Sequence, residues 1–286
     1  MTIHLHLGAH KTASTHIQAV LRKNAARLAG EGVRVVAPSE VRGLIGRGQR
    51  AAAEMAPIPS LRAALAARRL RRFLEGDERI AVSDENALGL TGEIIAAGAL
   101  YPHAAARLRL WRSAAGARPL AVYFAVRDYA PFFAGAHAQS IRGGAMIPLE
   151  PAQIARLAAL PRRWPDVIAD IRRALPAARM TLWRFEDYAA LQAEILRRMT
   201  GAGDLEPRRK RPMATPSAPA MEALFAAAAT RPGRRIPKDE FERAGAATAG
   251  PRYMPFGEAD QTRLATAYEE DVARFRTDPG IEFLVP

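Results

Sequence analysis

The chain contains no cysteine among its 286 residues. This absence excludes disulfide bonds, thiolate catalysis, iron–sulfur clusters and zinc sites built on cysteine. It does not identify a cellular compartment, because a protein without cysteine can fold in reducing or oxidising surroundings. Any chemistry that the protein performs must therefore use lysine, hydroxyl, carboxylate or imidazole groups.

Long apolar runs are also missing. No segment approaches the roughly 20 apolar residues of a membrane-spanning helix. The N-terminus lacks the basic region and following apolar region of a secretory signal, and residues 3–7 (IHLHL) already have the pattern of a strand. We therefore expect a cytoplasmic protein without a transmembrane segment.

Lysine is scarce, although positive charge is not. Of the 42 Lys and Arg residues, 38 are arginines, and with 29 acidic residues the formal net charge is +13. Such a surplus suggests a polyanionic partner (nucleic acid, acidic lipid or a phosphate-rich small molecule), or it reflects an arginine-rich composition. The run 68–72 (RRLRR) is predicted to be a solvated helix face. Because no aromatic residues interleave with the basic runs, no nucleic-acid partner is expected.

Short apolar runs alternate with longer segments rich in Ala, Leu and Arg. Strands separated by helices predict β–α–β crossovers and a parallel sheet. The run 120–126 (LAVYFAV) is apolar throughout, as expected for a strand covered on both faces. We predict an α/β fold with a parallel five-stranded sheet flanked by helices. The predicted strands are 3–7, 33–37, 79–83, 120–126 and 180–185, and the helices between them are 14–30, about 60–74, about 101–114 and 164–175.

The composition changes beyond residue 203, where a basic, proline-rich stretch begins. We predict one domain over 1–286, with a core at 1–203 and a C-terminal loop and helical extension at 204–286. Helices are expected at about 220–229 and at 258–276. The segments 38–59 and 231–255 are predicted to be surface loops, which commonly line a substrate pocket.

The first predicted strand leads into residues 8–15 (GAHKTAST), and a helix is predicted to begin at once. A helix N-terminus presents unpaired N–H groups and the positive end of its dipole, so a glycine-started loop there can wrap an anion. The spacing differs from the G-x-x-x-x-G-K-[ST] motif of nucleoside triphosphatases. An ordinary turn with helix-capping hydroxyls is the alternative. The residues predicted to cradle phosphate or sulfate are Gly8, Lys11, Thr12, Ala13, Ser14 and Thr15.

Residues 5–18 (LHLGAHKTASTHIQ) resemble the 5′-phosphosulfate loop of sulfotransferases that use 3′-phosphoadenosine 5′-phosphosulfate (PAPS). Ala13 stands where that family commonly has Gly, and Ser14 stands where it has Thr. Because Ala disfavours positive φ, the alanine predicts a slightly different or tighter loop. Bacterial members commonly read G-x-x-K-T-G-T-T-x-L-Q here, and the matching residues are Gly8, Lys11, Thr12, Thr15 and Gln18.

The resemblance also implies a site for the 3′-phosphate. In the family an Arg ends a central strand and a Ser follows eight residues later, and here these positions hold Arg127 and Gly135. Without that serine, weaker 3′-phosphate binding is predicted, and Ser140 lies too far along the helix to replace it. Residues 183–188, 211–217 and 252–256 resemble later family segments, so the resemblance covers most of the chain. It implies a parallel α/β fold related to nucleotide kinases.

The resemblance further implies sulfuryl transfer from PAPS, without a metal, to a hydroxyl or amine of a carbohydrate, lipid or small molecule. Lys11 would neutralise the leaving group, and an acidic side chain after strand 79–83 would act as base, with Glu85 favoured over Asp84. His10 and His137 are alternative bases, whereas His4 and His6 are predicted to be packing or hydrogen-bonded residues. A non-catalytic nucleotide-binding member and an ATP-dependent kinase are the alternative functions, and the oligomeric state is left open.

Overall fold

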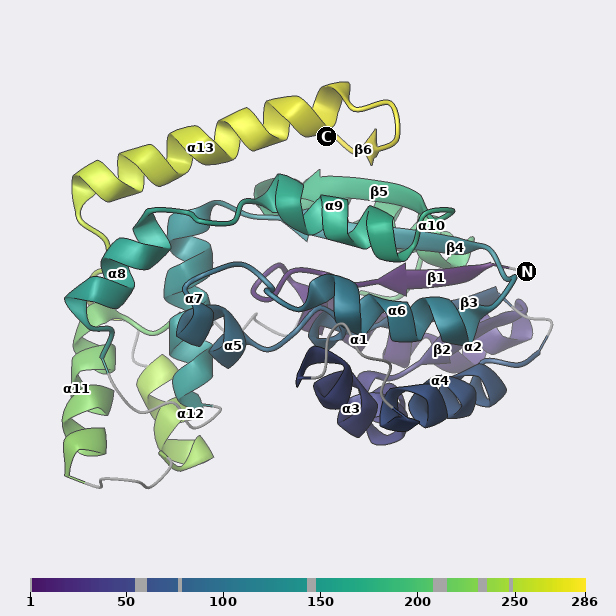
Figure 1. Ribbon diagram of the computed structural model, residues 1–286, viewed down its shortest axis with the longest axis horizontal. Coiled ribbons are helices and arrows are strands. Elements are labelled where there is room, and N and C mark those ends of the chain that lie inside the picture. Colours follow the sequence, from purple (N-terminus) through teal and green to yellow (C-terminus); the bar gives the residue numbers. More distant parts are fainter. Residues whose placement is uncertain are drawn as a thin grey trace.

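The computed structural model describes residues 2–54, 61–76, 79–142, 148–207, 215–230, 236–246 and 249–286. Within them six strands form one parallel sheet in the order β2–β3–β1–β4–β5–β6 (Figure 1). The predicted α/β class and all five predicted strands are confirmed. The sixth strand, β6, was missed because its two residues give no apolar run. The strands are β1 Ile3–His6, β2 Val33–Val36, β3 Arg79–Ser83, β4 Leu120–Val126, β5 Arg179–Arg184 and β6 Glu282–Phe283.

The sheet order places β1 in the middle, with β3 on one side and β4 on the other. The chain therefore runs from β1 to β2 and β3 on one side and then crosses from β3 to β4 on the other side. In open α/β sheets, ligands bind beside the carboxyl ends of the strands where the order reverses in this way. The segments that follow β1, β3 and β4 meet at this edge and carry most of the candidate site.

Helices cover both faces of the sheet (Figure 1). Two differences from the sequence prediction concern segments expected to be loops, since residues 38–54 and 238–246 are helical. The helices are α1 Ser14–Lys23, α2 Ala25–Gly30, α3 Pro38–Glu54, α4 Leu61–Phe73, α5 Thr91–Ala97, α6 Ala104–Ala115, α7 Tyr129–Arg142, α8 Pro151–Ala158, α9 Trp164–Ala174, α10 Tyr188–Thr200, α11 Ala218–Ala229, α12 Lys238–Ala246 and α13 Glu258–Thr277.

The predicted helix 14–30 is interrupted at Asn24, which separates α1 from α2. The Asn24 amide nitrogen donates to the carbonyls of Val20 and Glu206, at 2.9 Å and 3.1 Å. The Asn24 amide oxygen accepts the Glu206 backbone N–H at 3.0 Å. Asn side chains compete for backbone groups in this way, so the break ties the first helical segment to the chain beyond the core.

Two apolar cores fill the two faces of the sheet. One packs Ile17 of α1, Leu28 of α2 and Leu191 of α10 against β4 and β5. The other packs α4, α6 and α9 on the opposite face, with Leu108 and Ile171 among its members. Every residue of β4 is buried, which confirms the prediction of a strand covered on both sides.

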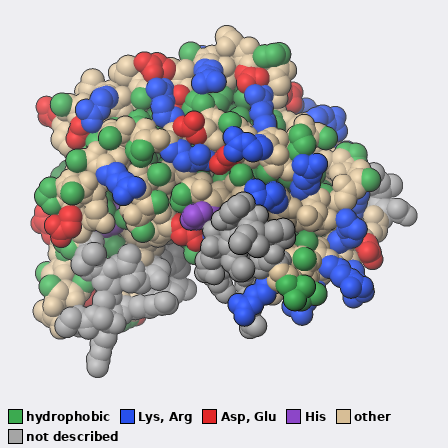
Figure 2. All heavy atoms as spheres, viewed as in Figure 1, with side chains coloured by type: hydrophobic (Ala, Val, Ile, Leu, Met, Phe, Trp, Pro, Cys, Tyr) green, Lys and Arg blue, Asp and Glu red, His purple; other side chains and the backbone are tan. Residues whose placement is uncertain are grey.

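The run RRLRR lies on α4, where Leu70 is buried and its four arginines are exposed, so the predicted solvated face is confirmed. On the face drawn in Figure 2, Lys and Arg side chains are spread among acidic and apolar ones and do not form one basic patch. No helix in the described part of the chain combines the length and hydrophobicity of a membrane span.

The C-terminal residues pack onto this framework. Met221 and Leu224 of α11 join Ala138 and Ile141 of α7 in a third apolar cluster. The helix α13 lies over α7, and the hydroxyl of Tyr129 donates a hydrogen bond to Asp271. Strand β6 then extends the sheet beyond β5.

Candidate functional site

The loop between β1 and α1 has an unusual backbone. Gly8, Lys11 and Ala13 all have positive φ, at 45°, 63° and 65°. Gly8 is required by close packing as well, because a Cβ there would lie 2.6 Å from Ser14 Oγ and 2.9 Å from His6 Cε1. Ala13 adopts the left-handed conformation although alanine disfavours it. Non-glycine residues held in this conformation are concentrated at binding sites.

Backbone N–H groups at the start of α1 find no acceptor in the loop. Across the described residues, no hydrogen bond is formed by the N–H groups of Thr12, Ala13, Ser14 or Thr15. Ala13 is the N-cap of α1 and offers no side-chain cap. These groups and the helix dipole provide a place where an anion would be stabilised.

The loop hydroxyls contribute less directly than the sequence predicts. The Thr12 hydroxyl donates to the Ala9 carbonyl at 2.5 Å, and the Ser14 hydroxyl lies 3.4 Å from the same oxygen. Both side chains are buried, whereas Thr15 is exposed. Thr12 therefore holds the loop in shape, while the backbone provides most of the donors for a ligand.

Lys11 joins the loop to α7. A Cβ on Gly135 would lie 3.1 Å from both Cγ and Cε of Lys11, so the lysine stem packs against this glycine. The Lys11 carbonyl accepts a 2.5 Å hydrogen bond from Arg127, whose guanidinium lies 4.5 Å from the centre of the Phe185 ring. Burial lowers the pKa of Arg127, and its Nε is buried with no hydrogen-bond partner among the described residues. The structure thus brings Lys11, Arg127 and Gly135 together, while their predicted contact with a nucleotide stays a prediction.

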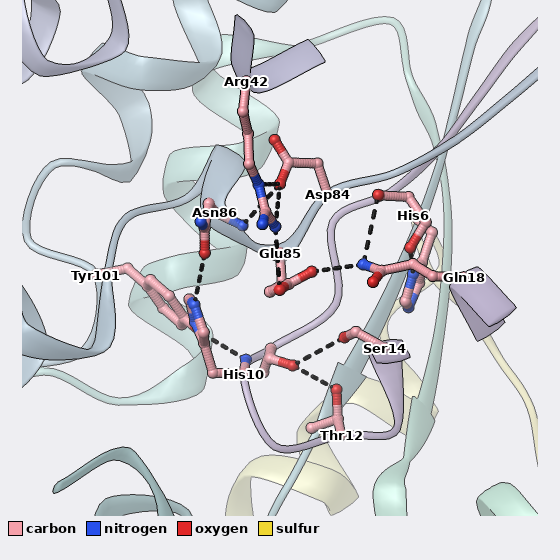
Figure 3. A network of polar contacts seen from close by, with 12 residues as sticks. His6, His10, Thr12, Ser14, Gln18, Arg42, Asp84, Glu85, Asn86 and Tyr101 are labelled. Atoms are coloured by element: carbon pink, nitrogen blue, oxygen red, sulfur yellow. Dashed lines mark hydrogen bonds and ion pairs between the residues drawn. The ribbon is translucent and has the colours of Figure 1, made fainter. Parts of the chain in front are cut away.

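Asp84 and Glu85 follow β3 and share one arginine. Figure 3 shows Arg42 extending from α3, with Nε 2.8 Å from Asp84 Oδ1 and a terminal nitrogen 3.1 Å from Glu85 Oε1. Gln18 of α1 donates to Glu85 Oε2 at 2.6 Å. The pair therefore connects α1 to α3.

The pKa values of the two carboxyl groups shift in opposite directions. Burial raises the pKa of Asp84 to about 6 against the opposing effect of Arg42, and Asp84 Oδ2 has no partner in the described chain. Burial also acts to raise the pKa of Glu85, but the charge of Arg42 and the hydrogen bond from Gln18 act against it, and that pKa lies below its ordinary value. The Glu85 side chain is 16% exposed and that of Asp84 is fully enclosed. Glu85 is thus the more acidic and more accessible member of the pair.

His10 is enclosed by partners. Its Nε2 lies 3.0 Å from Asn86 Oδ1, and its Nδ1 lies 2.9 Å from the Tyr101 hydroxyl, which also accepts the His10 backbone N–H at 2.8 Å. These contacts fit a neutral ring protonated on Nε2, with Tyr101 donating to Nδ1. Burial lowers the pKa of His10. Both ring nitrogens are occupied, so His10 fixes the loop position and does not offer a free base.

His4, His6 and His137 are each held by a hydroxyl group. His137 is buried on α7, with Nδ1 2.8 Å from the Tyr253 hydroxyl and its ring stacked on Phe225. His4 contacts the Tyr123 hydroxyl at 2.9 Å, and His6 contacts Ser83 Oγ at 2.8 Å. The predicted hydrogen-bonded, packing role of His4 and His6 is confirmed.

Sequence reasoning missed three residues of this site: Arg42, Asn86 and Tyr101. Arg42 is one of 38 arginines, and no local pattern marks it. Tyr101 lies in a turn between α5 and α6, far along the chain from the histidine that it contacts. Asn86 alone had a signal, because it directly follows the two candidate carboxylates.

In the part of the chain that the structure describes, no three His, Asp or Glu side chains are grouped so as to hold a metal ion. Comparison with models of known protein families and with curated proteins finds no match to this chain. The function must therefore be argued from the site. Its features are a loop with unpaired backbone N–H groups in the described chain, a lysine and an arginine beside it, and two carboxylates in the adjoining network.

Proposed function

We propose that the protein is a sulfotransferase that uses PAPS and sulfates a hydroxyl or amine of a carbohydrate, lipid or small molecule. The observation that carries the proposal is the first loop. Four consecutive backbone N–H groups without acceptors stand at the start of α1, beside Lys11. Such an arrangement suits a phosphate–sulfate group. The loop's resemblance to the PAPS loop of sulfotransferases favours this nucleotide over ATP.

The residues present fit such a ligand. The N–H groups of residues 12–15 would hold the 5′-phosphate and sulfate, and the orphaned Nε of Arg127 is a buried donor that a further anion would satisfy. When bound, PAPS supplies a sulfuryl group whose bond to the 5′-phosphate oxygen breaks as a bond to the acceptor oxygen or nitrogen forms. Lys11 would offset the charge that grows on the departing phosphate, and positioning would supply most of the remaining rate enhancement.

Glu85 is the residue proposed to take the acceptor's proton. Its pKa lies below the ordinary value, so it is ionised at neutral pH, and it is more exposed than Asp84. Gln18 and Arg42 fix its orientation from two sides. The same contacts weaken it as a base, because they favour the carboxylate over its protonated form. Asp84, with the raised pKa and the unpartnered Oδ2, is the second candidate.

This engagement of Glu85 favours one alternative, a protein that binds the nucleotide without transferring sulfate. The two functions differ in a direct experiment. Purified protein is titrated calorimetrically with adenosine 3′,5′-bisphosphate and, separately, with ATP and Mg²⁺, and is then incubated with PAPS and a panel of hydroxyl and amine acceptors. A sulfotransferase binds the bisphosphate and forms a sulfated product. Binding without product on any acceptor supports the alternative, and binding of ATP but not the bisphosphate refutes both.

A further inference from the structure

Gly135 is a glycine because its side-chain space is already filled. It lies within α7, where its φ is not positive, so backbone conformation does not require a glycine. A Cβ at this position would lie 3.1 Å from two carbons of Lys11 and 3.3 Å from Thr215 Oγ1. Two side chains from distant parts of the chain therefore converge on this one helical residue, and one of them ends in a hydroxyl.

The chain around Thr215 is anchored to a neighbouring segment. Ser217 and Arg252 form an antiparallel bridge. The Tyr253 N–H donates to the Pro216 carbonyl at 3.2 Å, and the Ala218 N–H donates to the Pro251 carbonyl at 2.8 Å. Ser217 then caps α11 through the Ala220 N–H. These contacts fix the backbone on the C-terminal side of Thr215, so its position beside Lys11 is set by the fold.

The Thr215 hydroxyl is available to a ligand. The side chain is half-buried, and it makes no hydrogen bond to any residue that the structure describes. Ser140 lies on α7, as Gly135 does, but its hydroxyl already donates to the His137 carbonyl at 2.7 Å. Of these two hydroxyls, only that of Thr215 both faces Gly135 and can donate to a ligand.

An arginine with an unsatisfied donor is connected to Thr215 through Lys11. Arg127 donates a hydrogen bond to the carbonyl of Lys11, whose side chain packs against Gly135 as Thr215 does. The Nε of Arg127 is buried and has no hydrogen-bond partner among the described residues. A phosphate would accept hydrogen bonds from this guanidinium and from the threonine hydroxyl.

We propose that Thr215 donates a hydrogen bond to the second phosphate of the bound nucleotide, the 3′-phosphate, in place of a hydroxyl at position 135. This inference rests on the proposed function, because it takes the first phosphate to be held by the N–H groups of residues 12–15. Gly135 makes the arrangement possible by leaving room for both Lys11 and Thr215. Thr215 is thus a specificity residue, since it distinguishes a 3′,5′-bisphosphate from a 5′-monophosphate.

The test compares two nucleotides on the full-length protein. Dissociation constants for adenosine 3′,5′-bisphosphate and adenosine 5′-monophosphate are measured by calorimetry for the wild type and for Thr215→Val, which keeps the side-chain shape but removes the hydroxyl. Losing a hydrogen bond to a charged group should weaken bisphosphate binding by about tenfold or more. Monophosphate binding should be unchanged. The conservative variant Thr215→Ser should retain wild-type affinity for both nucleotides.

Each other outcome has a definite meaning. Equal weakening for both nucleotides, or no weakening for either, overturns the role of Thr215 while the proposed function stands. A wild-type protein that binds neither nucleotide overturns the proposed function and this inference with it. The melting temperatures of the variants show whether Thr215→Val has lost its fold. If it has, Thr215→Ser is compared with the wild type instead. Weaker bisphosphate binding by the serine variant would then overturn the proposal.

Discussion

Replacing Ala13 by glycine should stabilise the protein, although the same substitution weakens most helices. Ala13 has φ 65° and ψ 14° at the N-cap of α1. The left-handed conformation costs an L-residue about 1–2 kcal/mol, and a glycine avoids this cost. Glycine is also preferred to alanine at N-caps. Against these gains stands the larger conformational freedom of glycine in the unfolded chain, about 0.4–1 kcal/mol.

The balance favours Ala13→Gly by about 1 kcal/mol, which corresponds to a rise in melting temperature of about 2 °C for a chain of this size. The control is Ala169→Gly, at an exposed position inside α9. There the backbone is helical, and glycine should destabilise the protein by about 1 kcal/mol. Urea unfolding measured on the wild type and both variants should therefore give shifts of opposite sign.

A destabilisation of similar size in both variants would refute the reasoning. It would mean that residue 13 has an ordinary helical or extended backbone in solution. The loop conformation that leaves four N–H groups unpaired at the start of α1 would then be wrong, and the basis for anion binding would fail. The experiment thus tests the geometry of the site without requiring knowledge of the ligand.

Three further predictions address single groups in the site. Lys11→Ala should reduce the sulfation rate by about 100-fold or more while the melting temperature changes little; a rate close to that of the wild type would remove Lys11 from the mechanism. Gly8→Ala should destabilise the protein by about 3 kcal/mol in urea unfolding, because its φ is 45° and the new Cβ would meet Ser14 Oγ at 2.6 Å; a loss below 1 kcal/mol would contradict the packing described for this glycine. The pKa of Asp84 is about 6 in the folded protein and near 3.8 in the unfolded chain, so the folded state binds this proton more tightly. The free energy of unfolding should therefore fall by roughly 3 kcal/mol as the pH rises from about 4 to 6. Asp84→Asn should remove that loss, and equal pH slopes for the variant and the wild type between these values would show that Asp84 is not the titrating group.

The sheet and the first loop could be predicted from the sequence because their signals are local. An apolar run such as 120–126 determines its own burial, and Gly8 and Lys11 lie within a few residues of the strand that ends before them. Asn24 could not be predicted to break a helix, because its partner Glu206 lies 182 residues away in the sequence. The helix α12 was hidden by the prolines and glycines around it.

The chemistry of the candidate base could be predicted only in part. The sequence places Asp84 and Glu85 side by side after a strand, but it cannot tell which of them is the stronger acid. That depends on Arg42, which comes from a segment predicted to be a loop, and on Gln18 from α1. Likewise, the replacement of serine by Gly135 predicts a weakened site, whereas Thr215 can be related to it only in three dimensions.

The position of β1 has a consequence for how the chain assembles during synthesis. Ile3 is made first, yet it pairs with Ile80 on one side and with Leu120 on the other. The central strand therefore has no partner until residue 80 has been made, and its other edge stays open until residue 120 of 286. Contacts so distant in sequence slow folding and leave strand edges open to aggregation. The first strand to be made is thus completed on both edges only after β4 has been made. Truncated or stalled chains that end before β4 should depend on chaperones to stay in solution.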